Sequence, residues 1–401
     1  MSCTFESYFE SLKNKRIAVF GLGVSNRPLV RLLLEFGCDV LGCDRTPREK
    51  LDEEVLELEN MGCKLSVGDN YLDGVEADIL FRTPGMHPGN PAIKALRSRG
   101  AQVTSEMEVF FEVCPCTLLA VTGSDGKTTT TTLTGEIFEE AGKKTKVVGN
   151  IGVAVVREAV QASEDTVFVT EVSSFQLEPI AQFHPHISAI LNLTPDHLDR
   201  HKTMQGYIDA KARIFENQGP DDYFVVNKDD APTWELAGRA KAAIVPFSRK
   251  EALDFGAYVE EGTIVVKDKE GVVHPVCGAK ELHIPGAHNL ENALAATAIA
   301  FCSGISVEVI ARVLRDFAGV EHRLELVRVV DGVKYINDSK GTNPDSSIKA
   351  LEAMETPVLL IAGGYDKKSS YEEFIKAFDG KVKKLLLLGV TAPAIRETAL
   401  S

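Results

Sequence analysis

Residues 117–132 constrain this chain more than any other segment, because a turn bracketed by glycines separates an apolar run from a threonine-rich run. The apolar run predicts a buried strand, and the residues after Lys127 predict a helix. Gly123 and Gly126 let backbone N–H groups face one anion at the start of that helix. Lys127 adds a positive charge, and the Thr128 hydroxyl is a ligand for Mg²⁺. We therefore expect a nucleoside triphosphate to contact Gly123, Ser124, Asp125, Gly126, Lys127, Thr128 and Thr129.

This loop departs from the standard P-loop pattern in one position. Val121 stands where that pattern has its first glycine, so the loop is shorter. The alternative is a glycine-containing turn that binds nothing. The strand before the turn and the helix after it favour the phosphate site, with ATP as the expected ligand.

Composition sets the class of protein. A chain of 401 residues is expected to hold two or three domains, and its net charge of −14 argues against nucleic acid and anionic membranes as partners. No apolar stretch is long enough to span a bilayer, and Glu6 and Glu10 interrupt any signal peptide. Eight scattered cysteines are typical of free thiols in a reducing compartment. We expect a cytoplasmic monomer that acts on small molecules.

The first 110 residues alternate strand and helix patterns, which predicts a parallel, doubly wound sheet. Its first turn holds Gly21 and Gly23, and Asp44 lies 23 residues beyond Gly21. A dinucleotide fold places an acidic residue there, but Asn26 replaces the third glycine of its fingerprint. The pattern favours a nucleotide-diphosphate site over a nicotinamide site, and a tight turn with no ligand remains open.

Two further blocks follow. The second runs to about residue 318, and residues 256–284 predict an antiparallel addition at its edge. The third holds three predicted strands within about 80 residues, which predicts a thin doubly wound domain. The fold class is therefore α/β.

Polar residues at strand ends are the candidates for chemistry, since open α/β sheets bind ligands there. Glu171 suits a Mg²⁺ that bridges phosphates, whereas His197 is open to a second cation or to hydrogen bonding. Lys211 lies on the apolar stripe of a predicted helix, and the sequence alone favours a side chain that reaches out to water over one with a buried partner. The remaining basic candidates are His322, Arg323, Lys340 and Lys367.

Eight segments taken together resemble the Mur ligases, the ATP-dependent amino-acid ligases of peptidoglycan precursor synthesis. The resemblance runs from about Lys15 to the last residue, and the segments occur in the same order. They are residues 122–129, 149–152, 171–178, 192–201, 207–214, 286–292, 321–323 and 337–343.

The resemblance implies three domains: a Rossmann-like UDP-substrate domain over 1–112, a P-loop ATPase-like central ATP domain over 113–318, and a Rossmann-like amino-acid domain over 319–401. It implies that Lys127, His197, Lys211 and Lys340 are catalytic. The implied metal ligands, for two Mg²⁺ sites, are Thr128, Glu171, His197 and a carbamylated Lys211. The residues implied to surround ATP beyond the loop are Asn150, Asn289, Asn292, His322, Arg323 and Asp338. Those implied to bind substrates are Gly21, Val24, Ser25, Asp44, Arg45, Gly85, Thr342 and Lys367.

Within the family, the first turn with Asp44, the Thr83-Pro84-Gly85 segment and residues 363–368 resemble the members that add D-glutamate to UDP-N-acetylmuramoyl-L-alanine. The implied reaction passes through an acyl phosphate. Such members continue for several tens of residues past the position of Ser401, with a serine and an aromatic residue that contact D-glutamate. We therefore expect the third domain to be incomplete. Another Mur-type or folylpolyglutamate-type ligase and a non-catalytic nucleotide-binding paralogue are the alternatives.

Overall fold

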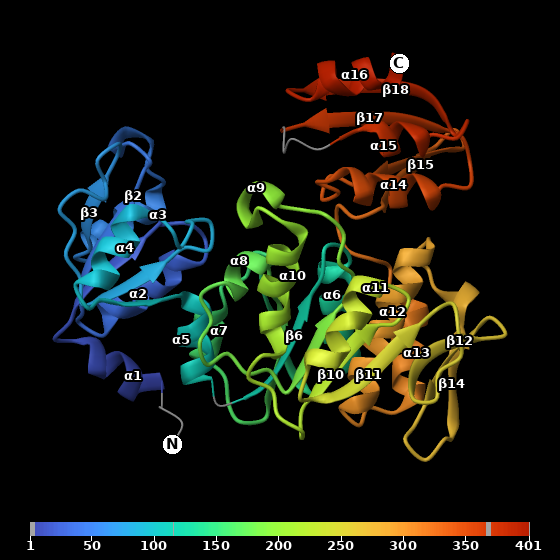
Figure 1. The fold of residues 1–401 in the computed structure, drawn as a ribbon, viewed down its shortest axis with the longest axis horizontal. Coiled ribbons are helices and arrows are strands. Elements are labelled where there is room, and N and C mark those ends of the chain that lie inside the picture. Colours follow the sequence, from blue (N-terminus) through green and yellow to red (C-terminus); the bar gives the residue numbers. More distant parts are fainter. Residues whose placement is uncertain (1–4, 115, 366–369, 401) are drawn as a thin grey trace.

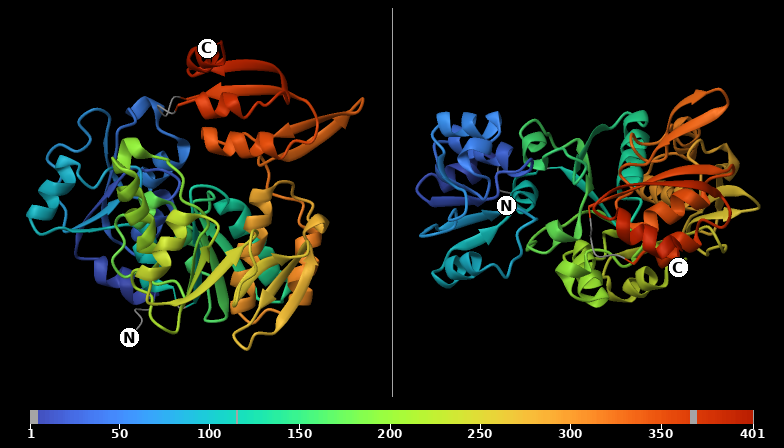
Figure 2. Two further views of the ribbon diagram at one scale, coloured as in Figure 1. Left: turned by 45° about the vertical axis from the view of Figure 1, so that its right-hand side comes forward. Right: turned by 90° about the horizontal axis from the view of Figure 1, so that it is seen from above.

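The computed structural model describes residues 5–114, 116–365 and 370–400. The described chain forms three lobes in sequence order (Figure 1). The N-terminal lobe lies beside the central lobe, and the C-terminal lobe lies over the central lobe, as the views in Figure 2 also show. Each lobe has sheet strands of its own.

The N-terminal lobe holds a five-stranded sheet in the order β3-β2-β1-β4-β5, with every neighbouring pair parallel. Strands β1 and β4 are almost entirely buried, as expected for a sheet covered on both faces. The doubly wound sheet predicted for this region is confirmed. The elements are α1 (Phe5–Leu12), β1 (Arg16–Phe20), α2 (Asn26–Glu35), β2 (Asp39–Asp44), α3 (Glu53–Asn60), β3 (Lys64–Val67), β4 (Ile79–Arg82), α4 (Pro91–Ser98) and β5 (Gln102–Thr104).

The central lobe is built on a nine-stranded sheet in the order β14-β13-β12-β11-β10-β9-β6-β8-β7. Strands β6 to β12 pair in parallel, and β12, β13 and β14 pair antiparallel at one edge, as predicted for residues 256–284. The strands are β6 (Thr117–Thr122), β7 (Lys144–Gly149), β8 (Thr166–Glu171), β9 (Ile187–Ile190), β10 (Tyr223–Asn227), β11 (Ala243–Ser248), β12 (Gly256–Glu260), β13 (Thr263–Lys267) and β14 (Val273–Gly278).

Helices cover both faces of this sheet, and the alternation along β6 shows how. Leu119 and Val121 pack in one apolar cluster with α6 and α12, whereas Leu118 and Ala120 pack in another with α5 and α7. Strand β6 is therefore buried on both sides, which fixes the loop that follows it. The helices are α5 (Glu106–Val113), α6 (Lys127–Glu140), α7 (Val155–Ala159), α8 (Ser174–Leu177), α9 (Leu198–His201), α10 (Met204–Ala212), α11 (Ala231–Glu235), α12 (Ala287–Cys302) and α13 (Val307–Asp316).

The C-terminal lobe differs from its prediction in one strand. Strands β17 (Val358–Gly364) and β18 (Val382–Gly389) are parallel as expected, but β16 (Val333–Asn337) pairs antiparallel with β15 (Glu325–Val330) in a separate ribbon. The cause is the turn Asp331-Gly332, in which both residues have positive φ, of 49° and 80°. This is the geometry of a two-residue hairpin turn. The helices of the lobe are α14 (Pro344–Glu352), α15 (Glu372–Lys376) and α16 (Ala392–Leu400).

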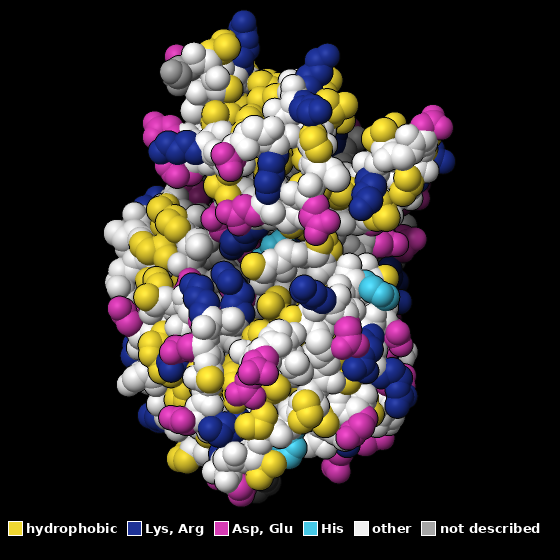
Figure 3. Space-filling view, turned by 90° about the vertical axis from the view of Figure 1, so that its right-hand side faces the viewer, with side chains coloured by type: hydrophobic (Ala, Val, Ile, Leu, Met, Phe, Trp, Pro, Cys, Tyr) yellow, Lys and Arg dark blue, Asp and Glu magenta, His cyan; other side chains and the backbone are white. Residues whose placement is uncertain are grey.

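Apolar side chains remain exposed on this lobe (Figure 3). Leu359 and Ile361 of β17 are 65% and 68% exposed, and Leu388 of β18 is 53% exposed. The opposite face packs on a small apolar cluster around Leu351, Phe374 and Ile395. The parallel pair β17–β18 is therefore covered on one face only within the described residues. None of the described helices combines the length and the apolar character needed to cross a membrane.

One buried carboxylate makes the stability of this fold depend on pH. Glu106 is 5% exposed and accepts a hydrogen bond of 3.1 Å from the Val156 N–H, and burial raises its pKa to about 7. The folded protein then holds a proton that the unfolded chain has released, so the contribution of Glu106 to stability falls as pH rises from about 4.5 to 7, by on the order of 3 kcal/mol.

We predict that Glu106→Gln flattens this decline, because the amide keeps the acceptor and does not titrate. Thermal unfolding followed between pH 5 and 8 measures the slope. The exposed Glu53→Gln variant is the control and should keep the wild-type slope. An equal slope in Glu106→Gln would assign the pH dependence to other groups.

Candidate functional site

The glycine-bracketed turn is the loop that joins β6 to α6. Gly126 has φ of +79°, and a Cβ atom there would lie 2.1 Å from Asn292 Oδ1, so only glycine fits. The Lys127 amine bends back and donates to the carbonyl oxygens of Gly123 at 3.0 Å and Ser124 at 2.8 Å. Burial lowers the pKa of Lys127, and the Glu171 carboxylate partly opposes that shift. The loop thus presents a half-buried amine beside a helix N-terminus, the arrangement that binds phosphate oxygens.

Glu171 lies next to the loop, because β8 pairs directly with β6 and Val121 faces Glu171 in the register. The sequence predicted this neighbourhood. Glu171 is 2% exposed, and its carboxylate accepts hydrogen bonds from Thr128 Oγ1 at 2.7 Å and Asn150 Nδ2 at 2.8 Å. A hydroxyl and a carboxylate are hard oxygen ligands of the kind that Mg²⁺ prefers. Thr128 and Glu171 therefore fit a magnesium ion.

Lys211 is buried, so the expectation that it reaches out to water is wrong. It is 2% exposed, and its amine donates to Gly123 O at 2.7 Å and Thr122 Oγ1 at 3.2 Å. The amine also lies 4.9 Å from the centre of the Tyr207 ring. Burial lowers the pKa of Lys211 well below its ordinary value, and the positive charge of Lys127 lowers it further. The protein thus favours a neutral amine at this position.

His197 borders the same cleft as Lys211. Its backbone has φ of +53°, its ring lies 4.8 Å from the Phe175 ring, and its Nε2 is 3.5 Å from Asp196 Oδ2. An unmodified Lys211 amine is directed at Gly123 and Thr122 and is a poor metal ligand, so His197 and Lys211 as they stand do not fit a second magnesium ion. Within the described residues no group of three or more His, Cys, Asp or Glu side chains has metal-binding geometry.

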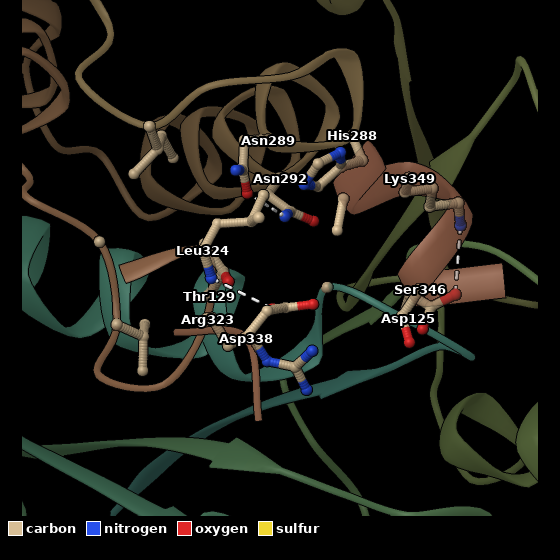
Figure 4. A pocket seen from close by; sticks show the side chains of 15 residues that line it. Asp125, Thr129, His288, Asn289, Asn292, Arg323, Leu324, Asp338, Ser346 and Lys349 are labelled. Atoms are coloured by element: carbon tan, nitrogen blue, oxygen red, sulfur yellow. Dashed lines mark hydrogen bonds and ion pairs between the residues drawn. The ribbon is translucent and has the colours of Figure 1, made fainter. Parts of the chain in front are cut away.

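A second cavity lies on the other side of the phosphate loop (Figure 4). It brings together Asn289 and Asn292 from α12 with Arg323 and Asp338 from the start of the C-terminal lobe. Asn292 Nδ2 donates to Asn289 Oδ1 at 3.1 Å, and Asp338 accepts from the Leu324 N–H at 3.1 Å. Arg323 Nε is buried and makes no hydrogen bond within the described chain, which leaves a donor for a ligand. Thr129 completes the wall nearest the loop.

Two residues expected around ATP do not line this second cavity. Asn150 lines the larger cleft that also contains Lys127 and Lys211, and its Nδ2 donates a hydrogen bond to the Glu171 carboxylate. His322 borders neither cavity; its side chain is 51% exposed and its ring Nδ1 accepts from Asn337 Nδ2 at 2.8 Å. The sequence could not distinguish His322 from Arg323, because it does not show which of two adjacent side chains borders a cavity.

The main cleft is lined by all three lobes and holds about 1450 Å³ of space between atoms, part of it open to solvent. Ser25 and Gly85 come from the N-terminal lobe, and Lys127 and Lys211 come from the central lobe. The C-terminal lobe contributes Lys340, Thr342 and Asn343. Lys367 lies outside the described residues. Candidate residues that lie far apart in the sequence therefore line the same cleft.

The other N-terminal candidates do not line this cleft. Gly21 has φ of +86°, and a Cβ atom there would meet Thr83 Cγ2 at 2.6 Å. Burial opposes ionisation of Asp44, but hydrogen bonds from the N–H groups of Leu22 and Thr46 keep its pKa below the ordinary value. Asp44 thus holds the backbone of the turn after β1 through the Leu22 N–H. Val24, 63% exposed, and Arg45 lie beside it, outside the cleft.

Arg200 is a residue that the sequence did not identify. Its guanidinium donates to the carbonyl oxygens of Gly85 at 2.7 Å and Pro84 at 3.0 Å, and to Glu178 Oε2 at 2.5 Å. It also stacks 4.4 Å from the Phe175 ring centre. Arg200 therefore ties the turn of the N-terminal lobe to the segment that carries His197. Nothing in the sequence marks the contact with the N-terminal lobe, since Pro84 and Gly85 lie more than 100 residues from Arg200.

Comparisons with known proteins agree with this architecture. The Mur ligase middle domain matches residues 121–300, and the domain described as "Mur ligase, glutamate ligase domain" matches residues 322–400. The UDP-N-acetylmuramoylalanine–D-glutamate ligase of Caldanaerobacter subterraneus subsp. tengcongensis is 47% identical over 392 residues, which cover 97% of this chain and 86% of the relative. The enzyme of the same name from Thermoanaerobacter sp. (strain X514) is 47% identical over 391 residues, with the same coverage.

Solved structures share the fold at low identity. MurF from Acinetobacter baumannii has a TM-score of 0.61 at 20% identity, over 96% of this chain and 83% of that one. UDP-N-acetylmuramate-alanine ligase from Thermotoga maritima has a TM-score of 0.59 at 20% identity, over 96% of this chain and 88% of that one. These similarities support the α/β fold across all three lobes.

We predict that Arg200→Ala lowers the free energy of unfolding by about 2 kcal/mol, because it leaves the largely buried Glu178 carboxylate, 13% exposed, without its main partner. Hydrogen exchange at residues 83–86 should rise at the same time. Urea unfolding and exchange mass spectrometry measure the two effects. The control is Arg239→Ala, which breaks an exposed pair with Asp209 and should cost less than about 1 kcal/mol. A loss no larger than that of the control would contradict the role of Arg200.

Proposed function

This chain belongs to the Mur ligase family, and we propose that it is the ATP-dependent ligase that joins D-glutamate to UDP-N-acetylmuramoyl-L-alanine. Two relatives named UDP-N-acetylmuramoylalanine–D-glutamate ligase are 47% identical to this chain across 97% of its length. The observation that carries the proposal is the cleft lined by all three lobes, with a phosphate loop at its centre. Such a cleft has room for two substrates beside a nucleotide. The proposed setting is cytoplasmic synthesis of peptidoglycan precursors.

The first step needs cations at the point where anions meet. The L-alanyl carboxylate attacks the γ-phosphorus of ATP, ADP leaves, and an acyl phosphate forms. Lys127 holds the phosphate oxygens, and the N–H groups at the start of α6 share their charge. Lys340 faces the same cleft from the C-terminal lobe and offsets the charge of the incoming carboxylate. These groups lower the repulsion between carboxylate and phosphate.

In the second step the amine of D-glutamate attacks the carbonyl carbon of the acyl phosphate. Phosphate leaves with the electrons of the broken C–O bond, and the ammonium-like amine gives up a proton as the amide forms. Thr342 and Lys367 are proposed to hold the carboxylates of D-glutamate, and Gly21, Ser25, Asp44 and Gly85 the uridine-diphosphate end of the other substrate. Water must be kept out, because acyl phosphates hydrolyse.

Magnesium would be held by Thr128 and Glu171, where it would supply positive charge next to the phosphates. A second site would need Lys211 to react with CO₂. The neutral amine attacks the carbon of CO₂ and loses a proton, and the resulting carbamate carries a negative charge. This change would turn a weak ligand into a carboxylate-like ligand beside His197. The low pKa of Lys211 supports this proposal, since only the neutral amine is nucleophilic.

The assay that tests the proposed function measures phosphate release from ATP with UDP-N-acetylmuramoyl-L-alanine, with and without D-glutamate. The proposal expects sustained release only when both substrates are present. Release with a different amino acid would indicate another ligase of the family. Binding of the nucleotide and the UDP substrate without turnover would indicate a non-catalytic binding protein.

We predict that Lys127→Met lowers turnover by roughly 10²–10³-fold, because it removes the charge aimed at the phosphates. Circular dichroism should show an unchanged fold. Lys146→Met is the control, since that lysine pairs with Glu158 away from the cleft and should keep activity within about twofold. Near-normal turnover in folded Lys127→Met would refute the phosphate role.

We also predict that Lys211→Ala loses activity and recovers part of it with a short carboxylic acid such as acetate, which would occupy the space left beside Thr122 and Gly123. Lys127→Met should not respond to the same acid. Steady-state turnover against acid concentration measures the effect. Full activity of Lys211→Ala without any added acid would exclude carbamylation as a requirement.

A further inference from the structure

The phosphate loop contains a negative charge of its own. Asp125 lies between the two glycines of the loop, and its side chain is 13% exposed and borders both cavities. A reciprocal pair of hydrogen bonds fixes its backbone: its N–H donates to Asn192 Oδ1 at 2.8 Å, and its carbonyl accepts from Asn192 Nδ2 at 3.2 Å. The carboxylate therefore stays at the site where phosphates are proposed to bind. An unpaired carboxylate there would repel them.

The C-terminal lobe supplies the charge that neutralises Asp125. Lys349, on the second turn of α14, places its amine 3.1 Å from Asp125 Oδ2, as the dashed contact in Figure 4 shows. Asn343, the N-cap residue of α14, adds a hydrogen bond of 3.5 Å to Asp125 Oδ1. These two contacts join residues that are 224 and 218 positions apart in the chain. Both come from α14 and its N-cap residue.

The same helix makes a further contact with the central lobe. Asp345 pairs with Lys349 at 3.0 Å, and it accepts a hydrogen bond of 3.3 Å from Thr194 Oγ1. Thr194 is itself tied to the loop, since its N–H donates to Ser124 Oγ at 2.9 Å. The start of α14 is thus docked on the phosphate loop by charges and hydrogen bonds, and Lys349 carries the positive charge that α14 brings to Asp125.

We propose that Lys349 is a positioning residue that acts through Asp125, so that the phosphate loop accepts a nucleotide when α14 is docked and repels it when α14 is released. This inference rests on the proposed function, because it requires that the loop binds a nucleotide. Linkage makes the effect reciprocal: nucleotide binding also favours the docked position of α14. The loop thereby senses the position of the C-terminal lobe.

The competing explanation is that Lys349 contacts the phosphates directly. The two explanations differ in what happens when both charges are removed together. If Lys349 acts through Asp125, removing the carboxylate as well restores a neutral loop. If Lys349 holds phosphate itself, the affinity stays low in the double variant. A double-mutant cycle separates them.

Isothermal titration calorimetry with Mg²⁺-ADP on the full chain tests the proposal, with folding of each variant checked by circular dichroism. Lys349→Met is expected to bind about tenfold more weakly than wild type, and Asp125→Asn at least as tightly as wild type. The double variant Asp125→Asn/Lys349→Met is expected within about threefold of wild type. Lys376→Met is the control, since it removes one exposed charge from the same lobe and should leave the affinity within about twofold.

Each result decides between the explanations. Recovery of affinity in the double variant supports the proposal. A double variant as weak as Lys349→Met, or a Lys349→Met variant equal to wild type, overturns it while leaving the proposed function intact. Absence of nucleotide binding by the wild-type chain contradicts the proposed function, and the inference with it.

Discussion

Two lysine amines, that of Lys211 buried and that of Lys127 half-buried, meet at one backbone carbonyl, and the rest of the site depends on this contact. Lys127 and Lys211 both donate to the Gly123 oxygen, at 3.0 Å and 2.7 Å. Two ammonium groups so close together repel, and burial removes the water that would screen them. The pKa of Lys211 falls furthest as a result, through burial first and the charge of Lys127 second. The neutral form is thus favoured at Lys211, which is the form that the proposed reaction with CO₂ requires.

The three lobes are joined to this centre by charged contacts. Arg200 links the central lobe to the Pro84 and Gly85 carbonyls of the N-terminal lobe. Lys349 links the C-terminal lobe to Asp125 in the phosphate loop. Ion pairs and hydrogen bonds of this kind can be made and broken without exposing a large apolar surface. A ligase that must admit three substrates and then exclude water has a use for such joints.

The sequence predicted the fold well where patterns are local. Strand β1 and the strand–loop–helix around Lys127 follow from apolar runs and glycines, and the observed bounds agree closely with the predicted ones. The neighbourhood of Glu171 and the phosphate loop also follows, because parallel strands end at the same edge. The pairing of β16 was missed although Asp331-Gly332 is a hairpin signal.

The rest depended on contacts between distant parts of the chain. Lys211 would lie on the apolar stripe of its helix whether its amine reached water or a buried partner. Only the tertiary structure shows that the amine contacts the Gly123 carbonyl oxygen. Arg200 and Lys349 look like ordinary surface cations in the sequence, because their partners lie in other lobes. The resemblance to a family supplied the proposed role of Lys211, whereas periodicity alone led to the wrong conclusion about its burial.

Oxygen transfer tests most directly whether this cleft activates a carboxylic acid by phosphorylation. The substrate UDP-N-acetylmuramoyl-L-alanine would be labelled with ¹⁸O in both oxygens of its terminal carboxylate, and the phosphate released with ATP and D-glutamate would be analysed by mass spectrometry. The account predicts one ¹⁸O atom in each phosphate released, because a carboxylate oxygen becomes the bridging oxygen of the acyl phosphate. Unlabelled phosphate accompanying amide formation would contradict it.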